Sequence, residues 1–473
     1  MNINGIKKQQ NNWSVSEILD ATKGRLICGD LKSSFNGISI DSRTICAGEM
    51  FVAIKGKIHD GHGFVQDVIR QKACGIIVDH DKIYSLPDMK QNQKNVCVAV
   101  KDTTKALGSL ALYNRKRFNP SVVAITGSNG KTTTKEMIFS ILKRYAQTLC
   151  SHGNYNNEIG VPLTLLRLTK SHKYVVLELG MNHPGEIANL AQMCLPDIGI
   201  ITNIGYAHLE GMESIEGVMH AKGEMLDNIK PDGTAILNAD DNLVLKLADR
   251  FDNNLFFGFS EKAAVSAQNI ETEDLHINFN LVLPGESISI AFDTPAVFMV
   301  SNALAAASAC YELGLSAQQI KAGLEAFHPV KGRLNIIKTS QKINIIDDTY
   351  NANPVSMEAA ITTLETLKKD KRSVLVLGDM YELGRYSEPF HRNIGTLAVL
   401  TNVSRIYLLG KFAQTIAEGI YAENKAFKGI IIGTVNEILD DMLKWLRPDD
   451  WVLVKGSRAM AMEGIINKLK NAL

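Results

Sequence analysis

Runs of consecutive apolar residues recur along this chain and predict buried β-strands separated by helices and turns. In the first part of the chain, short runs of this kind (GISI, MFVAI, GIIV and VCVAV) alternate with polar turn clusters such as residues 55–63. This alternation is typical of a small α/β unit. We predict a small α/β N-terminal domain over residues 1–115.

A second group of apolar runs begins with VVAIT at residues 122–126. Further runs follow at residues 173–179, 197–203 and 233–238. They are rich in β-branched residues and do not alternate with polar residues, which is the pattern of a parallel sheet covered on both faces. We predict a central domain over residues 116–328, built on this parallel sheet.

A third group of apolar runs occupies the last part of the chain. Its runs begin at residues 343, 373, 405, 429 and 451, with helical patterns between most of them. This order predicts a doubly wound, Rossmann-like α/β domain over residues 329–473. A chain of 473 residues is long enough for about three domains.

The balance of acidic and basic residues indicates which kinds of molecule the protein binds. Lys and Arg number 51 against 50 Asp and Glu, which leaves a net charge of +1. No overall field therefore favours nucleic acid or an anionic membrane, and a small-molecule partner is expected. The seven cysteines form no CxxC pair, and the N-terminal residues hold no apolar segment of signal-peptide length. We expect reduced thiols in a cytoplasmic protein without stable membrane insertion.

The stretch TGSNGKTTT at residues 126–134 has the composition of a phosphate-binding loop but an unusual spelling. In the common pattern a further glycine would stand where this chain has Ile125. The loop nevertheless lies directly between the strand VVAIT and a helical pattern that begins near Thr132. The alternative interpretation is a strand-to-helix turn with an incidental lysine.

The placement of this loop favours a nucleotide site, so the parallel sheet of the central domain is predicted to resemble that of P-loop ATPases. Gly127 and Gly130 allow backbone N–H groups to face an anion, and the helix N-terminus adds partial positive charge. Lys131 can reach the terminal phosphates of a nucleotide. The Thr132 hydroxyl is a suitable ligand for Mg²⁺.

Two further polar residues follow neighbouring strands of the predicted central sheet. Glu178 lies at the end of the run at residues 173–179, and His208 follows the run at residues 197–203. Carboxyl ends of parallel strands share one edge of a sheet, so both side chains are candidates for a metal site beside the phosphate loop. Taken alone, Glu178 could instead be a helix cap or ion-pair partner, and His208 an ordinary loop histidine.

Motifs along almost the whole chain resemble the Mur ligases, the ATP-dependent amide ligases that build the peptide of bacterial cell-wall precursors. The similar segments are TGSNGKTTT, GNYNNEIGVPLTLL, LELGMNHPGEI, NIGYAHLEGM, HAKGEM, DDTYNANPVSM, LGDMYELG and VLVKGSRAMAME. The family's phosphate loop has the short GxxGKT form seen here. The resemblance therefore implies a nucleotide site in the loop.

Within that family, YNANP, LGDMYELG and KGSRAMAME resemble the ligase that adds D-alanyl-D-alanine to UDP-N-acetylmuramoyl-tripeptide. The sister ligase for the third residue carries a DNPR motif, which is absent from this sequence. Residues 39–64 resemble the uridine-binding N-terminal domain that these two ligases share. Whether the third residue of the tripeptide is diaminopimelate or lysine stays open.

Two alternatives compete with this interpretation. A ligase of the folylpolyglutamate synthase type has a similar phosphate loop but lacks a uridine-binding domain, so residues 1–115 argue against it. A nucleotide-driven switch would carry an NKxD motif, which this sequence lacks.

The resemblance assigns expected roles residue by residue. ATP contacts are expected from Gly127, Ser128, Asn129, Gly130, Lys131, Thr132, Thr133, Asn302, Arg333 and Asp348. Metal ligands are expected at Thr132, Glu178, His208 and Lys222, and contacts to the UDP-sugar substrate at Ser42, Arg43, Asn156 and Asn157. Lys131, His208 and Lys222 are the expected catalytic residues.

The same resemblance implies ATP and Mg²⁺ as cofactors and a carbamylated lysine at Lys222. Asn335 departs from the family pattern, which usually has an acidic or apolar residue two places after the counterpart of Arg333. A monomer is expected, with hinges near residues 115 and 330.

Overall fold

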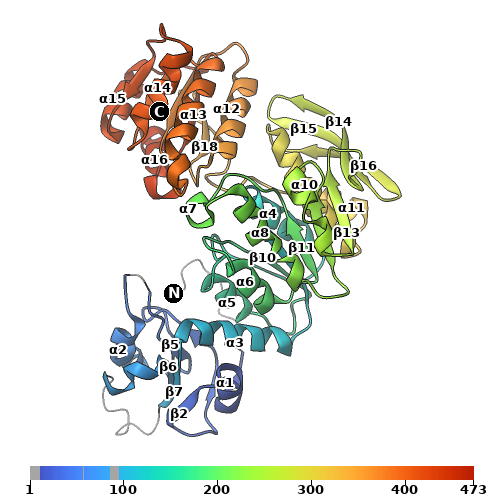
Figure 1. The fold of residues 1–473 in the computed structure, drawn as a ribbon, viewed down its shortest axis with the longest axis vertical. Coiled ribbons are helices and arrows are strands. Elements are labelled where there is room, and N and C mark those ends of the chain that lie inside the picture. Colours follow the sequence, from blue (N-terminus) through green and yellow to red (C-terminus); the bar gives the residue numbers. More distant parts are fainter. Residues whose placement is uncertain (1–10, 57, 86–94, 473) are drawn as a thin grey trace.

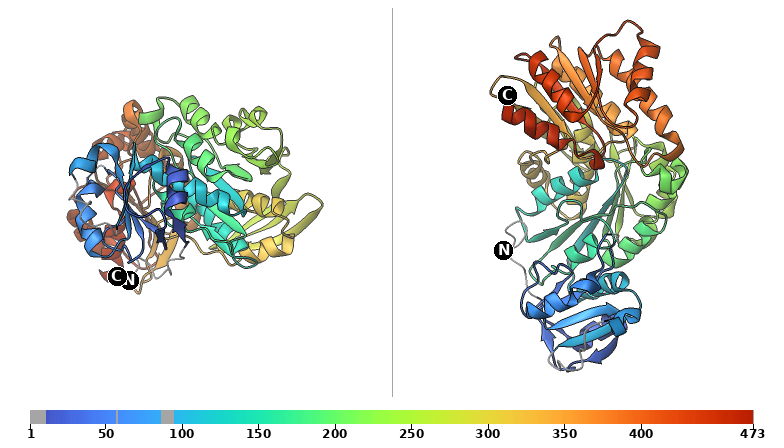
Figure 2. Two further views of the ribbon diagram at one scale, coloured as in Figure 1. Left: turned by 90° about the horizontal axis from the view of Figure 1, so that it is seen from below. Right: turned by 90° about the vertical axis from the view of Figure 1, so that its left-hand side faces the viewer.

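The computed structural model describes residues 11–56, 58–85 and 95–472. Three α/β bodies follow one another along the long axis of the molecule, with the blue N-terminal part at one end and the orange-red C-terminal part at the other (Figures 1 and 2). The predicted α/β class, with a small first domain and two larger mainly parallel sheets, is confirmed.

The N-terminal body is built on a five-stranded sheet in the order β2-β7-β6-β5-β4. Strands β4 to β7 are parallel, and β2 pairs antiparallel with β7. The elements of this body are β1 (Trp13–Ser14), α1 (Val15–Thr22), β2 (Arg25–Cys28), β3 (Ser34–Phe35), β4 (Ile38–Ser39), β5 (Met50–Val52), α2 (Val65–Arg70), β6 (Gly75–Asp79) and β7 (Val96–Val100).

A single helix, α3 (Thr103–Arg117), connects the first body to the second and crosses the predicted boundary at residue 115. Asn114 and Arg115 are 0% and 3% exposed. Asn114 donates to the carbonyl of Leu165 at 2.8 Å, at the end of α5 (Gly160–Leu165). Arg115 donates to the carbonyl of Cys194 at 3.0 Å, at the end of α6 (Glu186–Cys194). A hinge at residue 115 would therefore have to bend a helix and expose the last carbonyls of two others.

The central sheet has nine strands in the order β16-β15-β14-β13-β12-β11-β8-β10-β9. Strand β8 (Ser121–Thr126) pairs in parallel with β10 and β11, so the phosphate loop leaves the interior of the sheet. The remaining strands are β9 (Thr148–Cys150), β10 (Tyr174–Glu178), β11 (Ile198–Ile201), β12 (Thr234–Asn238), β13 (Asn254–Gly258), β14 (Val265–Glu273), β15 (His276–Leu283) and β16 (Glu286–Phe292).

Strands β14, β15 and β16 form an antiparallel arm on the parallel part of the sheet. This arm was not predicted from the sequence. The other helices of the central body are α4 (Lys131–Leu142), α7 (Leu209–Met212), α8 (Ile215–Gly223), α9 (Asn242–Leu245), α10 (Val297–Glu312) and α11 (Ala317–Leu324).

The C-terminal body has a six-stranded sheet in the order β17-β18-β22-β19-β20-β21, parallel except for β17. All five predicted strands are present. The elements are β17 (Asn335–Lys338), β18 (Asn344–Asp348), α12 (Pro354–Lys368), β19 (Ser373–Leu377), α13 (Ser387–Leu400), β20 (Arg405–Leu408), α14 (Ala413–Glu423), β21 (Ile430–Ile432), α15 (Val435–Trp445), β22 (Trp451–Lys455) and α16 (Glu463–Ala472).

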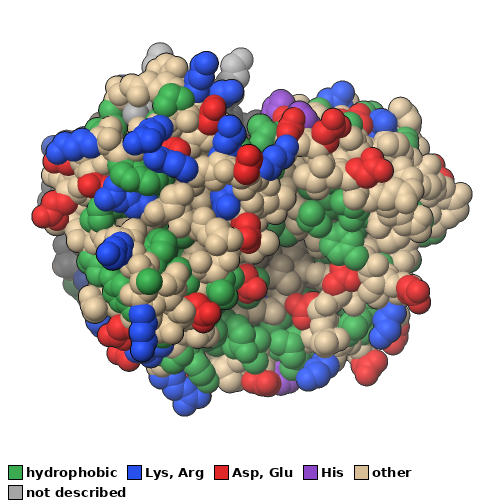
Figure 3. Space-filling view, turned by 90° about the horizontal axis from the view of Figure 1, so that it is seen from above, with side chains coloured by type: hydrophobic (Ala, Val, Ile, Leu, Met, Phe, Trp, Pro, Cys, Tyr) green, Lys and Arg blue, Asp and Glu red, His purple; other side chains and the backbone are tan. Residues whose placement is uncertain are grey.

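The surface carries charges of both signs. Acidic and basic side chains are mixed over the face shown in Figure 3, in keeping with the net charge of +1. Among the described residues, no helix combines the length and the apolar character that crossing a membrane requires.

Candidate active site

A cleft of about 750 Å³ lies where the central and C-terminal bodies meet. Most of the predicted site residues line it, namely Ser128, Asn129, Gly130, Lys131, Thr132, Thr133, Asn156, Asn157, Glu178, His208, Asn302, Arg333 and Asp348. Gly127 and Lys222 lie outside this lining, and Ser42 and Arg43 line a different pocket.

The two glycines of the phosphate loop are required by local geometry. Gly127 has φ 146° and Gly130 has φ 82°, both in the region that favours glycine. A Cβ at Gly127 would lie 1.9 Å from Oγ1 of Thr202, and a Cβ at Gly130 would lie 2.2 Å from Oδ1 of Asn302. The loop can therefore approach its neighbours closely only with glycine at both positions.

The side chain of Lys131 folds back over the loop that precedes it. Its Nζ donates to the carbonyl of Gly127 at 2.6 Å and lies 3.3 Å from the carbonyl of Ser128. Burial lowers the pKa of Lys131, the Glu178 carboxylate acts in the opposite direction, and the Arg333 guanidinium lowers the pKa further. An incoming polyanion would stabilise the charged form of this lysine.

A chain of hydrogen bonds joins the loop to the end of β10. Thr132 donates from Oγ1 to Glu178 Oε2 at 2.7 Å, and Asn156 donates from Nδ2 to Glu178 Oε1 at 2.8 Å. Arg333, from the start of the C-terminal body, donates to the same Thr132 hydroxyl at 2.9 Å. The two carboxylate oxygens of Glu178 are therefore held by different segments, Oε2 by Thr132 after the phosphate loop and Oε1 by Asn156.

On the C-terminal side of the cleft, a cluster of polar side chains surrounds Asp348, at the end of β18. Lys455, at the end of β22, lies 2.5 Å from Asp348 Oδ2 and is 2% exposed. The Arg333 guanidinium stacks over the ring of Tyr350 at 4.1 Å, and its buried Nε has no hydrogen-bond partner. A donor left free in this position suits an anionic ligand.

Asn302 lies on α10 beside the phosphate loop. Its Oδ1 is 3.5 Å from the Thr134 hydroxyl, and the side chain is 7% exposed. Asn157 has a local structural role, because its Oδ1 accepts from the backbone N–H of Gly160 at 2.9 Å and so holds the turn that leads into α5.

Lys222 is buried within α8 and is 1% exposed. Among the described residues it makes no ion pair and no side-chain hydrogen bond. Burial lowers the pKa of Lys222 well below its usual value, and the Lys131 ammonium acts in the same direction. A larger share of this amine is therefore neutral than in an exposed lysine.

His208 meets a carboxylate from the other side of the cleft. Its Nδ1 lies 2.7 Å from Oε2 of Glu382, although the two groups are not aligned as a hydrogen bond. The imidazole lowers the pKa of Glu382. The backbone N–H of Glu210 also donates to the Glu382 carbonyl at 3.0 Å.

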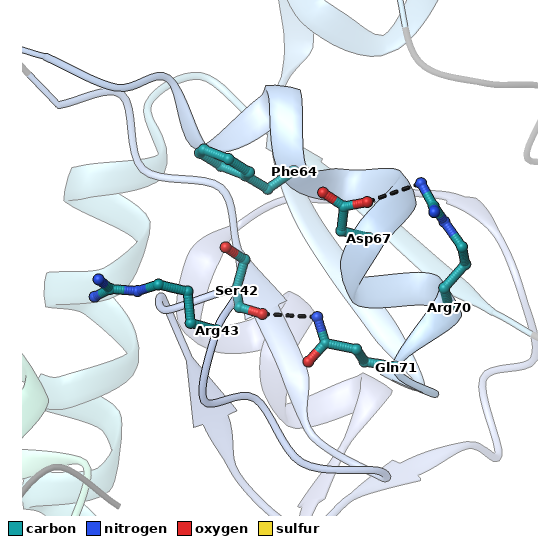
Figure 4. Close-up of a pocket in the computed structure, with 6 residues that line it drawn as sticks. All are labelled: Ser42, Arg43, Phe64, Asp67, Arg70 and Gln71. Carbon is teal, nitrogen blue, oxygen red and sulfur yellow. Dashed lines mark hydrogen bonds and ion pairs between the residues drawn. The ribbon is translucent and has the colours of Figure 1, made fainter.

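Ser42 and Arg43 lie in the N-terminal body, at a pocket of about 400 Å³ lined also by Phe64, Asp67, Arg70 and Gln71 (Figure 4). The Ser42 carbonyl accepts from Gln71 at 2.8 Å. Arg43 makes two 2.9 Å hydrogen bonds to the Asp41 carboxylate, and its side chain extends away from the Asp67–Arg70 pair. The predicted substrate contacts are thus split between two pockets.

Sequence reasoning did not single out some residues that complete the cleft. Asn353 donates to Asn129 Oδ1 at 2.8 Å, and Asn203 accepts from the backbone N–H of Asn129 at 2.8 Å. Lys455 and Asn353 lie within the quoted KGSR and YNANP motifs. Their roles as partners of Asp348 and of the loop could not be inferred because those partners are distant in the sequence.

The residues present fit a magnesium site. The described residues hold no cluster of three or more His, Cys, Asp and Glu side chains that could bind a metal. Thr132 and Glu178 instead offer adjacent oxygen atoms at the edge of the cleft. Mg²⁺ prefers oxygen ligands and commonly combines one or two carboxylates with substrate phosphates and water.

Comparisons with known proteins agree with this architecture. Residues 34–115, 125–310 and 332–458 match, in turn, the Mur ligase family catalytic domain, the Mur ligase middle domain and the Mur ligase glutamate ligase domain. The chain is 36% identical to the UDP-N-acetylmuramoyl-tripeptide--D-alanyl-D-alanine ligase of Haemophilus influenzae, over 97% of this chain and 99% of that protein.

Two solved structures are similar over nearly their whole length. MurF from Acinetobacter baumannii is 34% identical with a TM-score of 0.88, covering 98% of this chain and 100% of the other. MurF from Thermotoga maritima in complex with ADP is 28% identical with a TM-score of 0.81, covering 92% and 97%. The fold, the phosphate-loop cleft and the full-length identity lead to one conclusion: this chain belongs to the Mur ligase family.

Proposed function

We propose that this protein is an ATP-dependent, ADP-forming ligase that adds D-alanyl-D-alanine to UDP-N-acetylmuramoyl-tripeptide during peptidoglycan synthesis. The observation that carries the proposal is the shared cleft, in which Lys131, Thr132 and Glu178 face Arg333 and Asp348 of the C-terminal body. The full-length identity to ligases of this name supports the choice of substrates.

The reaction joins a carboxylate to an amine in two steps. The free carboxylate of the tripeptide attacks the γ-phosphorus of ATP, which forms an acyl phosphate and releases ADP. The amine of D-alanyl-D-alanine then attacks the acyl carbon, phosphate leaves with the bonding electrons, and the amine loses a proton. Lys131 and the backbone N–H groups of the loop stabilise the charge that builds on the transferring phosphoryl group.

Thr132 and Glu178 would hold one Mg²⁺, and His208 with a carbamylated Lys222 would hold a second. Bound Mg²⁺ neutralises phosphate charge and reduces the repulsion between ATP and the attacking carboxylate. Lys222 suits carbamylation because its amine is buried, unpaired and lowered in pKa. The carbamate would replace a cation with an anion beside the metals.

We assign residues 1–115 to the UDP-precursor, residues 116–328 to ATP and residues 329–473 to the incoming dipeptide. Ser42 and Arg43 would contact the uridine or diphosphate, and Asn156 the sugar end near the cleft. The backbone amides of residues 127–133, with Asn302, Arg333 and Asp348, would hold ATP. A cytoplasmic monomer completes the proposal.

An ADP-release assay tests this function. The purified protein is given ATP and Mg²⁺ with UDP-N-acetylmuramoyl-tripeptide carrying either diaminopimelate or lysine, with and without D-alanyl-D-alanine. We expect ADP release to depend on both the tripeptide and the dipeptide. Release driven by a folate and glutamate, and not by these substrates, would favour the folylpolyglutamate synthase alternative instead.

A further inference from the structure

One segment of the C-terminal body, residues 381–390, packs on residues 206–210 of the central body, which include the start of the short helix α7. The Glu382 carbonyl accepts from the backbone N–H of Glu210 at 3.0 Å. The rings of Tyr206 and Phe390 meet with centroids 4.9 Å apart. These contacts join two bodies whose sheets are separate.

At the centre of this contact, two residues with unfavourable backbone conformations face each other. His208 has φ 57° and Glu382 has φ 63°, in the left-handed region that side chains with a Cβ seldom adopt. His208 is the residue before α7, and Glu382 is in the loop after β19. Strained residues of this kind persist where surrounding contacts hold them, and they gather at functional sites.

We propose that Glu382 is a positioning residue that fixes the imidazole of His208, so that this side chain is set for metal binding only when the C-terminal body is docked. Nδ1 of His208 lies 2.7 Å from Glu382 Oε2, within hydrogen-bond distance although not aligned as a hydrogen bond in this structure, and Nε2 has no partner among the described residues. A carboxylate on one ring nitrogen is the usual way in which a metal-binding histidine is oriented through the other. Here that carboxylate comes from a different domain.

The inference rests on the proposed role of His208 as a metal ligand. The Glu382 side chain is 54% exposed, against 23% for His208, so the pair adds little to the attachment of the two bodies. Its contribution is to the direction of the ring. Loss of the carboxylate should therefore change metal binding without changing the stability of the fold.

The test compares Glu382→Ala with Glu388→Ala as a matched control. Glu388 lies six positions along the same segment, is exposed, and has no partner among the described residues. Binding of Mn²⁺ is measured by electron paramagnetic resonance in the presence of ADP, where no turnover occurs. We expect Glu382→Ala to weaken Mn²⁺ binding by about 10-fold, in the range of outer partners of metal ligands, and Glu388→Ala to leave it unchanged.

A second readout follows activity. Glu382→Ala should raise the Mg²⁺ concentration for half-maximal ADP release, with kcat at saturating Mg²⁺ close to that of the parent protein. Glu382→Gln keeps an oxygen acceptor and should show a smaller shift. Unchanged thermal unfolding of both variants would separate this effect from a loss of fold.

The variant His208→Ala separates the positioning role of Glu382 from the metal-binding role of His208. If His208→Ala weakens Mn²⁺ binding and Glu382→Ala does not, the positioning role of Glu382 is wrong while the proposed metal site stands. If His208→Ala leaves Mn²⁺ binding unchanged, the proposed role of His208 fails and the positioning role fails with it.

Discussion

In the proposed reaction, Lys131 is the residue whose positive charge would most directly stabilise the transferring phosphoryl group. Lys131→Ala should fold normally, because among the described residues the Lys131 ammonium bonds only to two carbonyls of its own loop. We expect kcat to fall by about 100-fold or more, the scale set by removing one preorganised donor. ADP-release assays measure this loss of kcat. Near-normal turnover in a folded Lys131→Ala variant would contradict the proposed catalytic role of Lys131.

Lys222 provides a second prediction at this scale. Lys222→Ala should be almost inactive, because it removes the proposed carbamate, and partly rescued by acetate, which can occupy the vacated space. Lys222→Arg should not be rescued, because its guanidinium stays charged and fills that space. Turnover is measured across an acetate titration, and full activity of Lys222→Ala without acetate would show that no carbamate is needed.

Residues that belong to a local pattern could be placed at the cleft from the sequence, and residues defined by distant partners could not. Lys131 and Thr132 follow from a loop between a strand and a helix, and Glu178 from its place at a strand end. Lys222 was singled out only through the family resemblance, since nothing in its local sequence indicates that the amine is buried and unpaired. The pairing of Glu382 with His208 depends on how two domains meet.

At the scale of elements, helix α3 is predicted to stabilise the central body through its end. Asn114→Ala removes two buried hydrogen bonds, to the carbonyls of Leu165 and Leu168, although each carbonyl keeps one other donor, from the Leu168 N–H and the Asn11 side chain respectively. We expect a loss of about 1–3 kcal/mol in the free energy of unfolding, measured by urea denaturation. Lys116→Ala, on the exposed side of the same helix, is the control. An equal loss of unfolding free energy in both variants would contradict the proposed stabilising role of the Asn114 side chain.

The sequence pattern predicts parallel strands better than exposed antiparallel ones. The five apolar runs of the C-terminal body are all strands because both faces of that sheet are covered. In the arm, β15 alternates between buried and partly exposed residues, and most of β14 is not buried. Strands that are open to water on one face lack a continuous apolar run, so the arm was missed.

At the scale of the whole molecule, the UDP end of the precursor and the reacting carboxylate would be held by different bodies. Binding energy gained far from the reaction then positions the carboxylate near ATP. A tripeptide without its UDP-sugar should therefore show a much lower kcat/KM. Comparison of the two substrates in the ADP-release assay checks this, and equal efficiency would remove the role proposed for residues 1–115.

The order of three α/β bodies was predictable from the grouping of apolar runs, but their contacts were not. Asn129 and Asn353 are joined across the cleft although 224 positions separate them. Nothing in the local sequence of either asparagine indicates the other. Such contacts depend on the relative placement of two finished domains, which is decided by whole surfaces and not by local patterns.

The attachment of α3 has a consequence for which substrates the protein accepts. Because its side chains cap α5 and α6, the N-terminal and central bodies should move as one unit, and the span between the pocket at Ser42 and the phosphate loop should be constant. A fixed distance between the two sites would allow only one length of peptide to bring its carboxylate to ATP. A precursor with one amino acid fewer would still bind by its nucleotide, but its carboxylate would end short of ATP, so peptide length would be selected by distance alone.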